Sequence, residues 1–266
     1  MAGLQVVLDF RVVDESDDWI IVDKPAPLIV HPTNRKPEPT LLGGLESLLA
    51  FEIETGRKPA VVNRLDRDTS GLVLVAKHRD AASELGKAFE RREVEKEYVA
   101  VVVGWPDVEE WECREPIVRA GVVATSKIWV RQVVDPRGKP CATRFRVERR
   151  FERGGERFCV VRCFPETGRM HQIRVHLADG GHPIVGDKLY AGDGEEYIEW
   201  MAKGWTPALR ERLHLPRQAL HADRMALPWR GEWLDWRIGM PDDLDDFVAG
   251  REIKDTPNVV IWDRNA

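Results

Sequence analysis

A cluster of acids and arginines stands directly before an apolar run in the first third of the chain. The cluster spans residues 63–71 (NRLDRDTSG), and the apolar run spans residues 72–76 (LVLVA). An apolar run of this length, bounded by glycine and polar residues, is typical of a buried strand. The charges fit a loop that caps the strand through ion pairs, and they also fit a functional site. This segment alone leaves both interpretations open.

A second segment, residues 166–190, is rich in arginine and histidine. Ile173 and Leu177 are spaced as on one helix face, and Gly180 with Gly181 is a typical helix stop. One short helix would then carry four basic side chains within eight residues, namely Arg169, His171, Arg174 and His176. That density is high for a helix face that only meets solvent.

Together with three weaker elements, these segments resemble the RluA-type family of RNA pseudouridine synthases. The family's first signature, HRLDx(D/E)TSG, is matched at residues 64–71, with Asn63 in place of the histidine. Its later signature, GRTHQ(I/L)RxHL followed by GHPIxGDxxY, is matched at residues 168–190 with Met170 for threonine. The weaker elements follow the family's order: WIIVDKP and VHP within residues 19–32, KEYVAVVVG at 96–104 and RQALHA at 217–222. The resemblance covers about residues 10–240.

The resemblance implies an isomerase that converts uridine in RNA to pseudouridine. The uracil detaches from the ribose, rotates and reattaches through carbon 5, so neither a redox step nor a cofactor is required. A carboxylate must act near the anomeric carbon, as a nucleophile or as a base. By matching the motif this residue is Asp66, which Arg174 would keep ionised across the cleft. Tyr98 matches the tyrosine that packs on the target base and relays the proton from carbon 5.

The side chains that contact the RNA are also implied by the resemblance. Arg64 matches the arginine that enters the RNA stack and supports the flipped-out nucleotide, because a stacked base cannot react. Ile173 or Leu177 would supply the apolar floor of the site. The other expected substrate contacts are Arg67, Lys96, Arg169 and His171.

Two departures from the family pattern fall close to these residues. Asn63 replaces a histidine, and its amide can still hydrogen-bond to the backbone, so the expected change is local. Met170 replaces a threonine and removes a hydroxyl near the helix start, which would loosen a phosphate contact. Neither departure affects Asp66, Tyr98 or Arg174.

Other functions compete with catalysis on RNA. A non-catalytic RNA-binding relative would keep the cleft, but the intact Asp66, Tyr98 and Arg174 disfavour it. A hydrolase with Asp66 as nucleophile would need an activated water and a second acid or base, and no such partner stands out. No metal site is predicted, since no histidine pair has a zinc-ligand spacing with a third ligand.

The charge balance is unusual for a protein that binds RNA. The 40 Lys and Arg against 45 Asp and Glu give a net charge of −5, whereas nucleic-acid-binding proteins are usually basic. The acids concentrate at residues 14–18, 195–196 and 242–246. The bases concentrate at residues 64–67, 91–92, 144–153 and 169–174. A basic cleft on an acidic body can bind phosphates, with modest non-specific affinity. The resemblance implies that the partner is ribosomal or transfer RNA.

The location follows from segments that the sequence lacks. It has no apolar stretch of membrane-spanning length and no charged leader before an apolar core, so a cytoplasmic protein without membrane attachment is expected. The four cysteines form no Cys-x-x-Cys motif. Cys159 and Cys163 are predicted to be small core residues on one strand face.

The coarse pattern is α+β. Strands are predicted at residues 19–24, 72–76, 94–103, 142–150 and 157–164, and near 123–134. Helices are predicted at residues 41–51 and 80–92, and after the Thr206-Pro207 cap. Runs of strands without βαβ alternation favour a large antiparallel sheet. The resemblance implies a mixed, mostly antiparallel sheet with flanking helices and a central RNA-binding cleft.

We expect residues 1–266 to form one catalytic domain, with a core over about residues 10–240 and an acidic tail over residues 241–266. The tail should pack as an acidic helix followed by a strand at residues 259–262. No separate N-terminal RNA-binding domain is expected, and neither is an obligate protein partner. The protein is expected to be a monomer.

Overall fold

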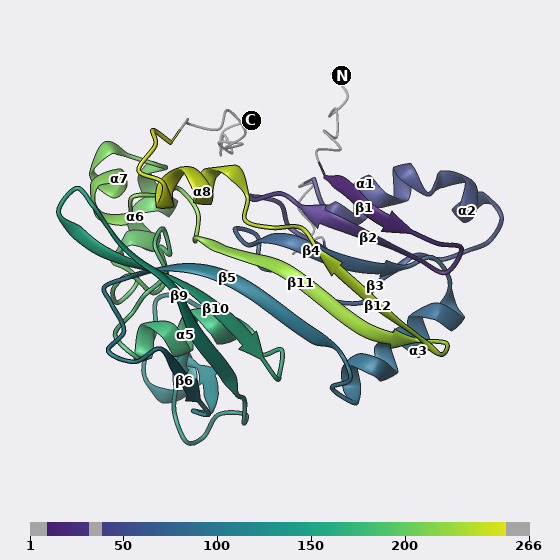
Figure 1. Ribbon diagram of the computed structural model, residues 1–266, viewed down its shortest axis with the longest axis horizontal. Coiled ribbons are helices and arrows are strands. Elements are labelled where there is room, and N and C mark those ends of the chain that lie inside the picture. The colour runs from purple at the N-terminus through teal and green to yellow at the C-terminus, as the bar shows by residue number, and fades with distance from the viewer. Residues whose placement is uncertain (1–9, 32–38, 254–266) are drawn as a thin grey trace. The chain divides into compact units, whose positions relative to one another are not determined.

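The computed structural model describes residues 10–31 and 39–253. The predicted strand at residues 259–262 and Pro32 of the VHP element lie outside these residues. The chain divides into two compact units (Figure 1). The first holds the chain up to Lys96 together with Ala222–Gly239, and the second holds Glu97–His221 and the chain from Met240 onward. The chain passes from one unit to the other within strands β5 (Glu95–Val103) and β11 (Leu220–Trp229).

The first unit is a sheet with a buried central strand. Its strands are β1 (Arg11–Glu15), β2 (Trp19–Lys24), β3 (Ala60–Val61), β4 (Ser70–Ala76), β11 and β12 (Glu232–Arg237). The order is β1-β2-β4-β11, with β12 beside β11 and β3 beside β4. All seven residues of β4 are buried. A strand buried on both faces reads as a continuous apolar run, which is the pattern at residues 72–76.

Helix α3 (Arg79–Glu90) covers the β4 region of the first unit, as the apolar spacing at residues 80–92 predicts. Its N-cap is His78, whose Nδ1 accepts a hydrogen bond from the Ala81 backbone N–H at 3.3 Å. Its apolar stripe, with Leu85 at the centre, packs in one cluster with Leu72 and Leu74.

The helix predicted at residues 41–51 is two helices in the structure. They are α1 (Leu41–Leu48) and α2 (Ala50–Glu54). The chain leaves helical geometry at Leu49, with φ −96° and ψ 26°. The buried side chains of the pair all lie on α1, and α2 has none.

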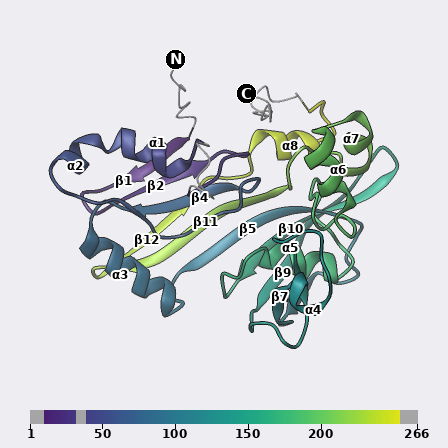
Figure 2. The same ribbon diagram turned by 180° about the vertical axis from the view of Figure 1, so that it is seen from behind.

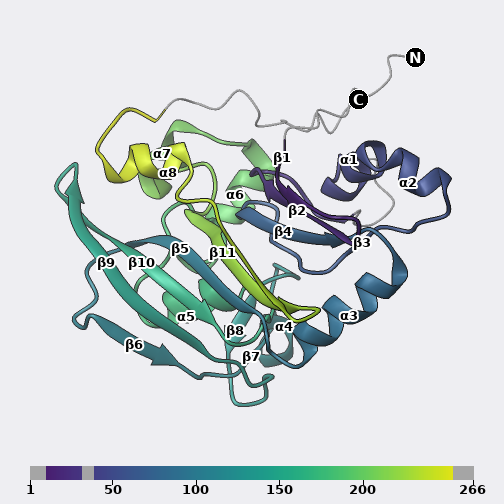
Figure 3. The ribbon, with the colours of Figure 1, turned by 45° about the vertical axis from the view of Figure 1, so that its right-hand side comes forward.

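The second unit is an antiparallel sheet in the order β5-β10-β9-β6, where β6 is Glu110–Cys113, β9 is Thr143–Arg153 and β10 is Glu156–Pro165. The long β9–β10 hairpin is plain in Figure 3. It turns at Gly154 and Gly155, with φ of +60° and +83°. Two consecutive positive φ values are what a tight hairpin turn of matching twist requires, so glycine fits both positions.

The strand predicted near residues 123–134 is mostly wrong. Residues 120–123 form the helical turn α4, and only Gln132–Val134 (β8) is a strand, which pairs with β7 (Ile117–Arg119). Three large apolar side chains within residues 123–134 are exposed: Val123, Trp129 and Val130.

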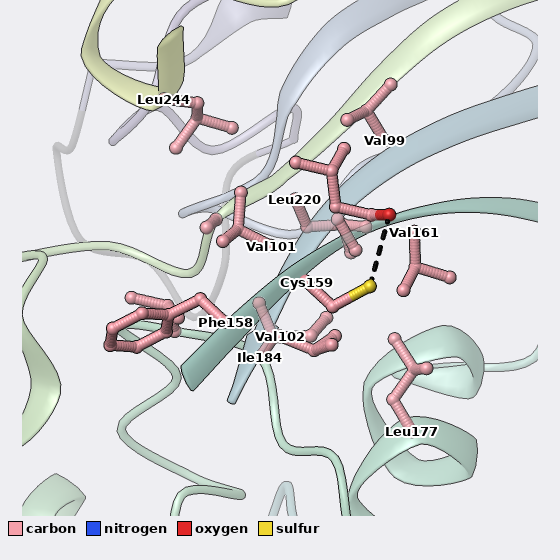
Figure 4. Close-up of a cluster of buried hydrophobic side chains, with 14 of the residues drawn as sticks. Val99, Val101, Val102, Phe158, Cys159, Val161, Leu177, Ile184, Leu220 and Leu244 are labelled. Carbon is pink, nitrogen blue, oxygen red and sulfur yellow. Dashed lines mark hydrogen bonds between the residues drawn. The ribbon is translucent and has the colours of Figure 1, made fainter. Parts of the chain in front are cut away.

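The core of the second unit lies on both faces of β5 and β10. Leu177 of α5 (Gln172–Asp179) lies to one side of β10 and Leu244 of α8 (Asp242–Val248) to the other (Figure 4). Cys159 and Cys163 are buried in this cluster, which confirms their predicted role as core residues.

The remaining helices are α6 (Glu195–Lys203) and α7 (Pro207–Leu213). The predicted cap of α7 is confirmed, because the Thr206 side chain accepts a hydrogen bond from Leu209 N at 3.2 Å. The predicted acidic helix of the tail is α8. The fold class is α+β with a large mixed sheet and flanking helices, as predicted. No helix in the described part of the chain is long and apolar enough to cross a membrane.

Candidate active site

Asp66 lies in the first unit, in the loop between β3 and β4. The Thr69 N–H donates to the Asp66 carbonyl at 3.1 Å and closes a turn over residues 66–69. The Asp66 side chain is half-buried, as is that of Arg67, while Arg64 is exposed. The loop therefore presents a carboxylate with two arginines beside it in sequence, one of them open to solvent.

Lys24 ties this loop to the segment that follows β2. Its side chain is fully buried, and Nζ donates to the carbonyls of Pro25 (2.7 Å), Leu28 (2.8 Å) and Arg67 (3.2 Å). The Arg67 carbonyl also accepts from Leu28 N at 3.0 Å. Because Arg67 follows Asp66 directly, Lys24 fixes the backbone beside the carboxylate. No sequence pattern indicates this role of Lys24.

Asn63 and Gly71 lie at the two ends of the loop. The Asn63 side chain bonds to the backbone, and the backbone at Gly71 leaves no room for a side chain. Asn63 Oδ1 accepts from Leu74 N at 2.7 Å, and Nδ2 donates to Leu72 O at 3.2 Å, so its predicted backbone hydrogen bonding is confirmed. Gly71 has φ +116°, and a Cβ built there would lie 2.4 Å from the Ala222 carbonyl oxygen. Only glycine admits this approach of β11 to the start of β4.

Tyr98 and Lys96 lie on β5 with their side chains on one face, because strand positions alternate. Tyr98 is half-buried against the core of the second unit, and its Cα is paired with that of Cys163. Burial lowers the pKa of the Lys96 amine.

Arg174 is buried on α5 and forms a two-pronged ion pair with Asp187. The Arg174 Nε donates to Asp187 Oδ2 at 2.6 Å, and Nη2 donates to Oδ1 at 2.8 Å. Asp187 Oδ1 also accepts from Leu189 N at 3.0 Å, so this residue anchors its own loop as well. The Arg174 guanidinium carbon lies 5.0 Å from the centre of the Tyr190 ring. Asp187 is a partner of Arg174 that no sequence pattern indicates.

The predicted helix starts later than expected, so Arg169 and His171 lie before it and not on it. Helix α5 begins at Gln172, and His171 has a left-handed backbone with φ 59°. The buried Gln172 side chain accepts from Thr167 Oγ1 at 2.7 Å and from Arg169 N at 3.0 Å, which holds the preceding residues in a loop. His171 Nδ1 lies 2.8 Å from the Tyr190 hydroxyl.

Ile173 and Leu177, the expected apolar floor, are both buried in the core cluster of the second unit. Leu177 faces β10 from α5, as Figure 4 shows. Met170 remains largely exposed in the loop before the helix.

Two further histidines of the second unit, His176 and His182, make structural contacts. His176 bridges Thr143 Oγ1 (3.0 Å) and the Glu115 carbonyl (3.0 Å), and burial lowers its pKa, so it is neutral at pH 7. His182 Nδ1 lies 3.1 Å from the Val103 carbonyl. Over residues 10–31 and 39–253, no three His, Cys, Asp or Glu side chains are placed to hold a metal ion.

The structure thus groups the predicted residues by unit. Arg64, Asp66 and Arg67 share one loop of the first unit. His171 and Arg174 both contact Tyr190 in the second unit, where Tyr98 also lies. The predicted ion pair between Asp66 and Arg174 stays a prediction.

Comparison with known proteins shows what the chain is similar to. The family described as RNA pseudouridylate synthase matches residues 18–179. Ribosomal large subunit pseudouridine synthase D of Nitrosomonas europaea is 35% identical over 240 residues, which are 89% of this chain and 64% of that protein. The protein of the same name from Yersinia pestis is 36% identical over 250 residues, 93% of this chain and 71% of that protein.

A solved structure shares the fold. Human RNA pseudouridylate synthase domain containing 1 superposes with a TM-score of 0.66 at 24% identity, covering 90% of this chain and 86% of that chain.

Proposed function

Because the chain belongs to the RNA pseudouridylate synthase family, which isomerises uridine in RNA to pseudouridine, we propose that it modifies ribosomal RNA of the large subunit. The substrate class rests on the names of the two bacterial relatives. The observation that carries the chemistry is the occurrence of Asp66, Tyr98 and Arg174 at the matching positions of the family's motifs.

Asp66 is the proposed catalytic carboxylate. It attacks the anomeric carbon of the target uridine or removes a proton from the ribose, and either route frees the uracil from its bond through nitrogen 1. The uracil turns and bonds to the ribose through carbon 5. Carbon 5 then loses its proton, and nitrogen 1 carries one in the product. No atom is gained or lost overall, so the reaction needs no co-reactant.

Arg174 is proposed to keep Asp66 ionised. A carboxylate removed from water remains charged when a cation lies beside it. The proposal is supported by the ion pair with Asp187, which orients the Arg174 guanidinium and engages two of its five N–H donors. Asp187 would then be the residue that aims Arg174.

Tyr98 and Arg64 are proposed to handle the target nucleotide. The Tyr98 ring can pack on the uracil while its hydroxyl relays the proton from carbon 5. Arg64 is exposed, which suits a side chain that enters the RNA and takes the space of the flipped-out base. Arg67, Lys96, Arg169 and His171 are proposed to contact the surrounding RNA.

The Asp66→Asn variant tests the catalytic proposal. The amide keeps the shape of the side chain and loses its charge, so conversion of uridine should disappear while folding and RNA binding survive. Tritium release from RNA labelled at carbon 5 of uridine measures conversion. Asp179→Asn, at an exposed carboxylate of α5, is the matched control and should stay fully active. Activity of Asp66→Asn within about tenfold of wild type would refute the assignment.

Mapping of pseudouridines in RNA from cells with and without the gene tests the substrate. The expected difference is the loss of specific pseudouridines from large-subunit ribosomal RNA. A difference confined to transfer RNA would show that the substrate proposal is wrong and leave the isomerase chemistry in place.

A further inference from the structure

The segment from Ile117 to Val134, here called the arm, exposes four large apolar side chains. It consists of β7, α4 and β8 with the loop between α4 and β8. Its exposed apolar residues are Val122, Val123, Trp129 and Val130. Several large apolar side chains exposed within one short segment commonly mark an interaction site.

Trp129 is the most prominent of these side chains, at 76% exposed. Arg119 lies with its guanidinium carbon 4.0 Å from the centre of the Trp129 ring, which is the geometry of a cation–π pair. The neighbouring Ile128 is buried in a cluster with Val175 and Leu189. The exposed indole therefore projects from an anchored backbone.

The arm is also basic. No Asp or Glu occurs between Pro116 and Val134, whereas Arg119, Lys127 and Arg131 all lie in that stretch. The whole chain carries a net charge of −5, so this local excess of cations is against the trend of the molecule. An acidic ligand suits such a surface.

The base of the arm is bonded to the residues around Arg174. The Tyr190 hydroxyl accepts from Gln132 N at 2.9 Å and lies 2.8 Å from His171 Nδ1. The guanidinium carbons of Arg131 and Arg174 lie 5.6 and 5.0 Å from the centre of the Tyr190 ring. Figure 2 shows α4 and β7 close to α5, which carries Arg174. One tyrosine thus joins the arm to the proposed RNA site.

We infer that the arm is an RNA-binding surface on which an unpaired base stacks against the indole of Trp129. Arg119 backs the ring and, with Lys127, binds the adjoining phosphates. Stacking on an aromatic ring tolerates any base, so the arm adds affinity and not sequence choice. This inference rests on the proposed function, because it takes RNA as the ligand.

The Trp129→Ala variant of the full chain is the test, with a transcribed fragment of large-subunit ribosomal RNA as the probe. Loss of one stacked base should weaken binding about tenfold, and Trp129→Phe should restore most of the affinity. Trp233→Ala is the matched control, since Trp233 is 52% exposed on β12 of the first unit. The RNA affinity of this variant should stay within about twofold of wild type. Lys127→Gln should reduce the salt dependence of binding by about one phosphate contact.

Affinities are measured in the Asp66→Asn background, where conversion cannot interfere, and tritium release is measured separately with Asp66 present. If the enzyme is active but its Trp129→Ala variant binds RNA as tightly as the parent, the arm is not an RNA-binding surface and the proposed function stands. If the enzyme with Asp66 present is inactive but its RNA binding still depends on Trp129, the proposed function is wrong and the arm remains an RNA-binding surface.

Two other ligands have distinct signatures. If Trp129→Ala leaves RNA affinity unchanged but abolishes binding to phosphatidylglycerol vesicles, the arm is a membrane contact and the inference is wrong. If Trp129→Ala leaves RNA affinity unchanged but abolishes a concentration-dependent dimer detected by sedimentation, the arm is a contact between two copies of the chain and the inference is again wrong.

Discussion

Asp187 holds Arg174 by two hydrogen bonds, and the side chains of both residues are shut off from water, at 0% and 5% exposure. An ion pair in such a place is costly to break on one side, because the remaining charge stays buried without compensation.

Asp187→Asn is therefore expected to lower the free energy of unfolding by roughly 3–5 kcal/mol. It should also reduce turnover, since the guanidinium of Arg174 loses its fixed orientation. Urea unfolding gives the first quantity and tritium release the second. Asp245→Asn is the control: it breaks the exposed pair with Arg251 and should cost less than about 1 kcal/mol. Equal, small losses in the two variants would contradict the assigned role of Asp187.

Tyr98→Phe separates proton transfer from base packing. The ring persists, so RNA affinity should change little, while the loss of the hydroxyl should slow turnover by about 10²- to 10⁴-fold. Single-turnover kinetics and filter binding on the same RNA provide the two readouts. A parallel fall in both would make Tyr98 a packing or binding residue.

Acid stability should depend on Asp243. Burial alone would raise the pKa of Asp243, but the charge and hydrogen bonds of Arg217 outweigh it and lower the pKa from its ordinary value of 3.8. A lowered folded-state pKa gives stability that is fully present above the ordinary value and is lost as the pH falls through the folded one.

The wild type should therefore lose free energy of unfolding from about pH 4 downward, and Asp243→Asn should lose less over the same range while being less stable at pH 7. Unfolding in urea at several pH values measures both slopes. Asp242→Asn, at the exposed neighbour in the same helical turn, is the control and should stay close to wild type in stability at pH 7. A slope for Asp243→Asn that equals the wild-type slope would exclude this pair as a source of the acid sensitivity.

Two glycine substitutions should act in opposite directions. Gly71→Ala forces a side chain onto the Ala222 backbone at positive φ and should cost roughly 3 kcal/mol or more. Gly86→Ala lies inside α3 with open space around it and should stabilise the protein by roughly 0.5–1 kcal/mol. Thermal unfolding ranks both against wild type. A neutral Gly71→Ala would mean that β11 does not approach β4 as described.

The sequence is informative where local pattern decides the structure. The run at residues 72–76 is strand β4, and the stripe with Leu85 at its centre is α3, because a buried strand and an amphipathic helix each leave a periodic signature. The start of α5 could not be read this way. The Gln172 side chain binds the backbone of Arg169 and displaces the helix start, and that contact has no periodic signal.

The same limit applies to the site. Asp66, Tyr98 and Arg174 stand in recognisable motifs, so their positions could be proposed from the sequence. Asp187 and Lys24 act through partners that the fold brings to them. Neither the ion pair of Asp187 with Arg174 nor the hydrogen bond of Lys24 to the Arg67 carbonyl can be predicted from sequence spacing. The apolar residues of the arm have the sequence pattern of a strand. They differ from strand residues in the core by being exposed, and exposure depends on tertiary packing, which the local sequence does not show.

The contact between Gly71 and Ala222 has a consequence for how the protein is made. The first unit is discontinuous, since its strand β4 needs β11, which the ribosome delivers only after the entire stretch from Glu97 to His221 has been synthesised. Until then β3 covers only the Val75 and Ala76 end of this edge of β4. The rest of the edge lacks its β11 partner, and unpaired strand edges invite mispairing during synthesis. Closing a loop of this length is slow, so the nascent chain should depend on chaperones up to the moment β11 emerges.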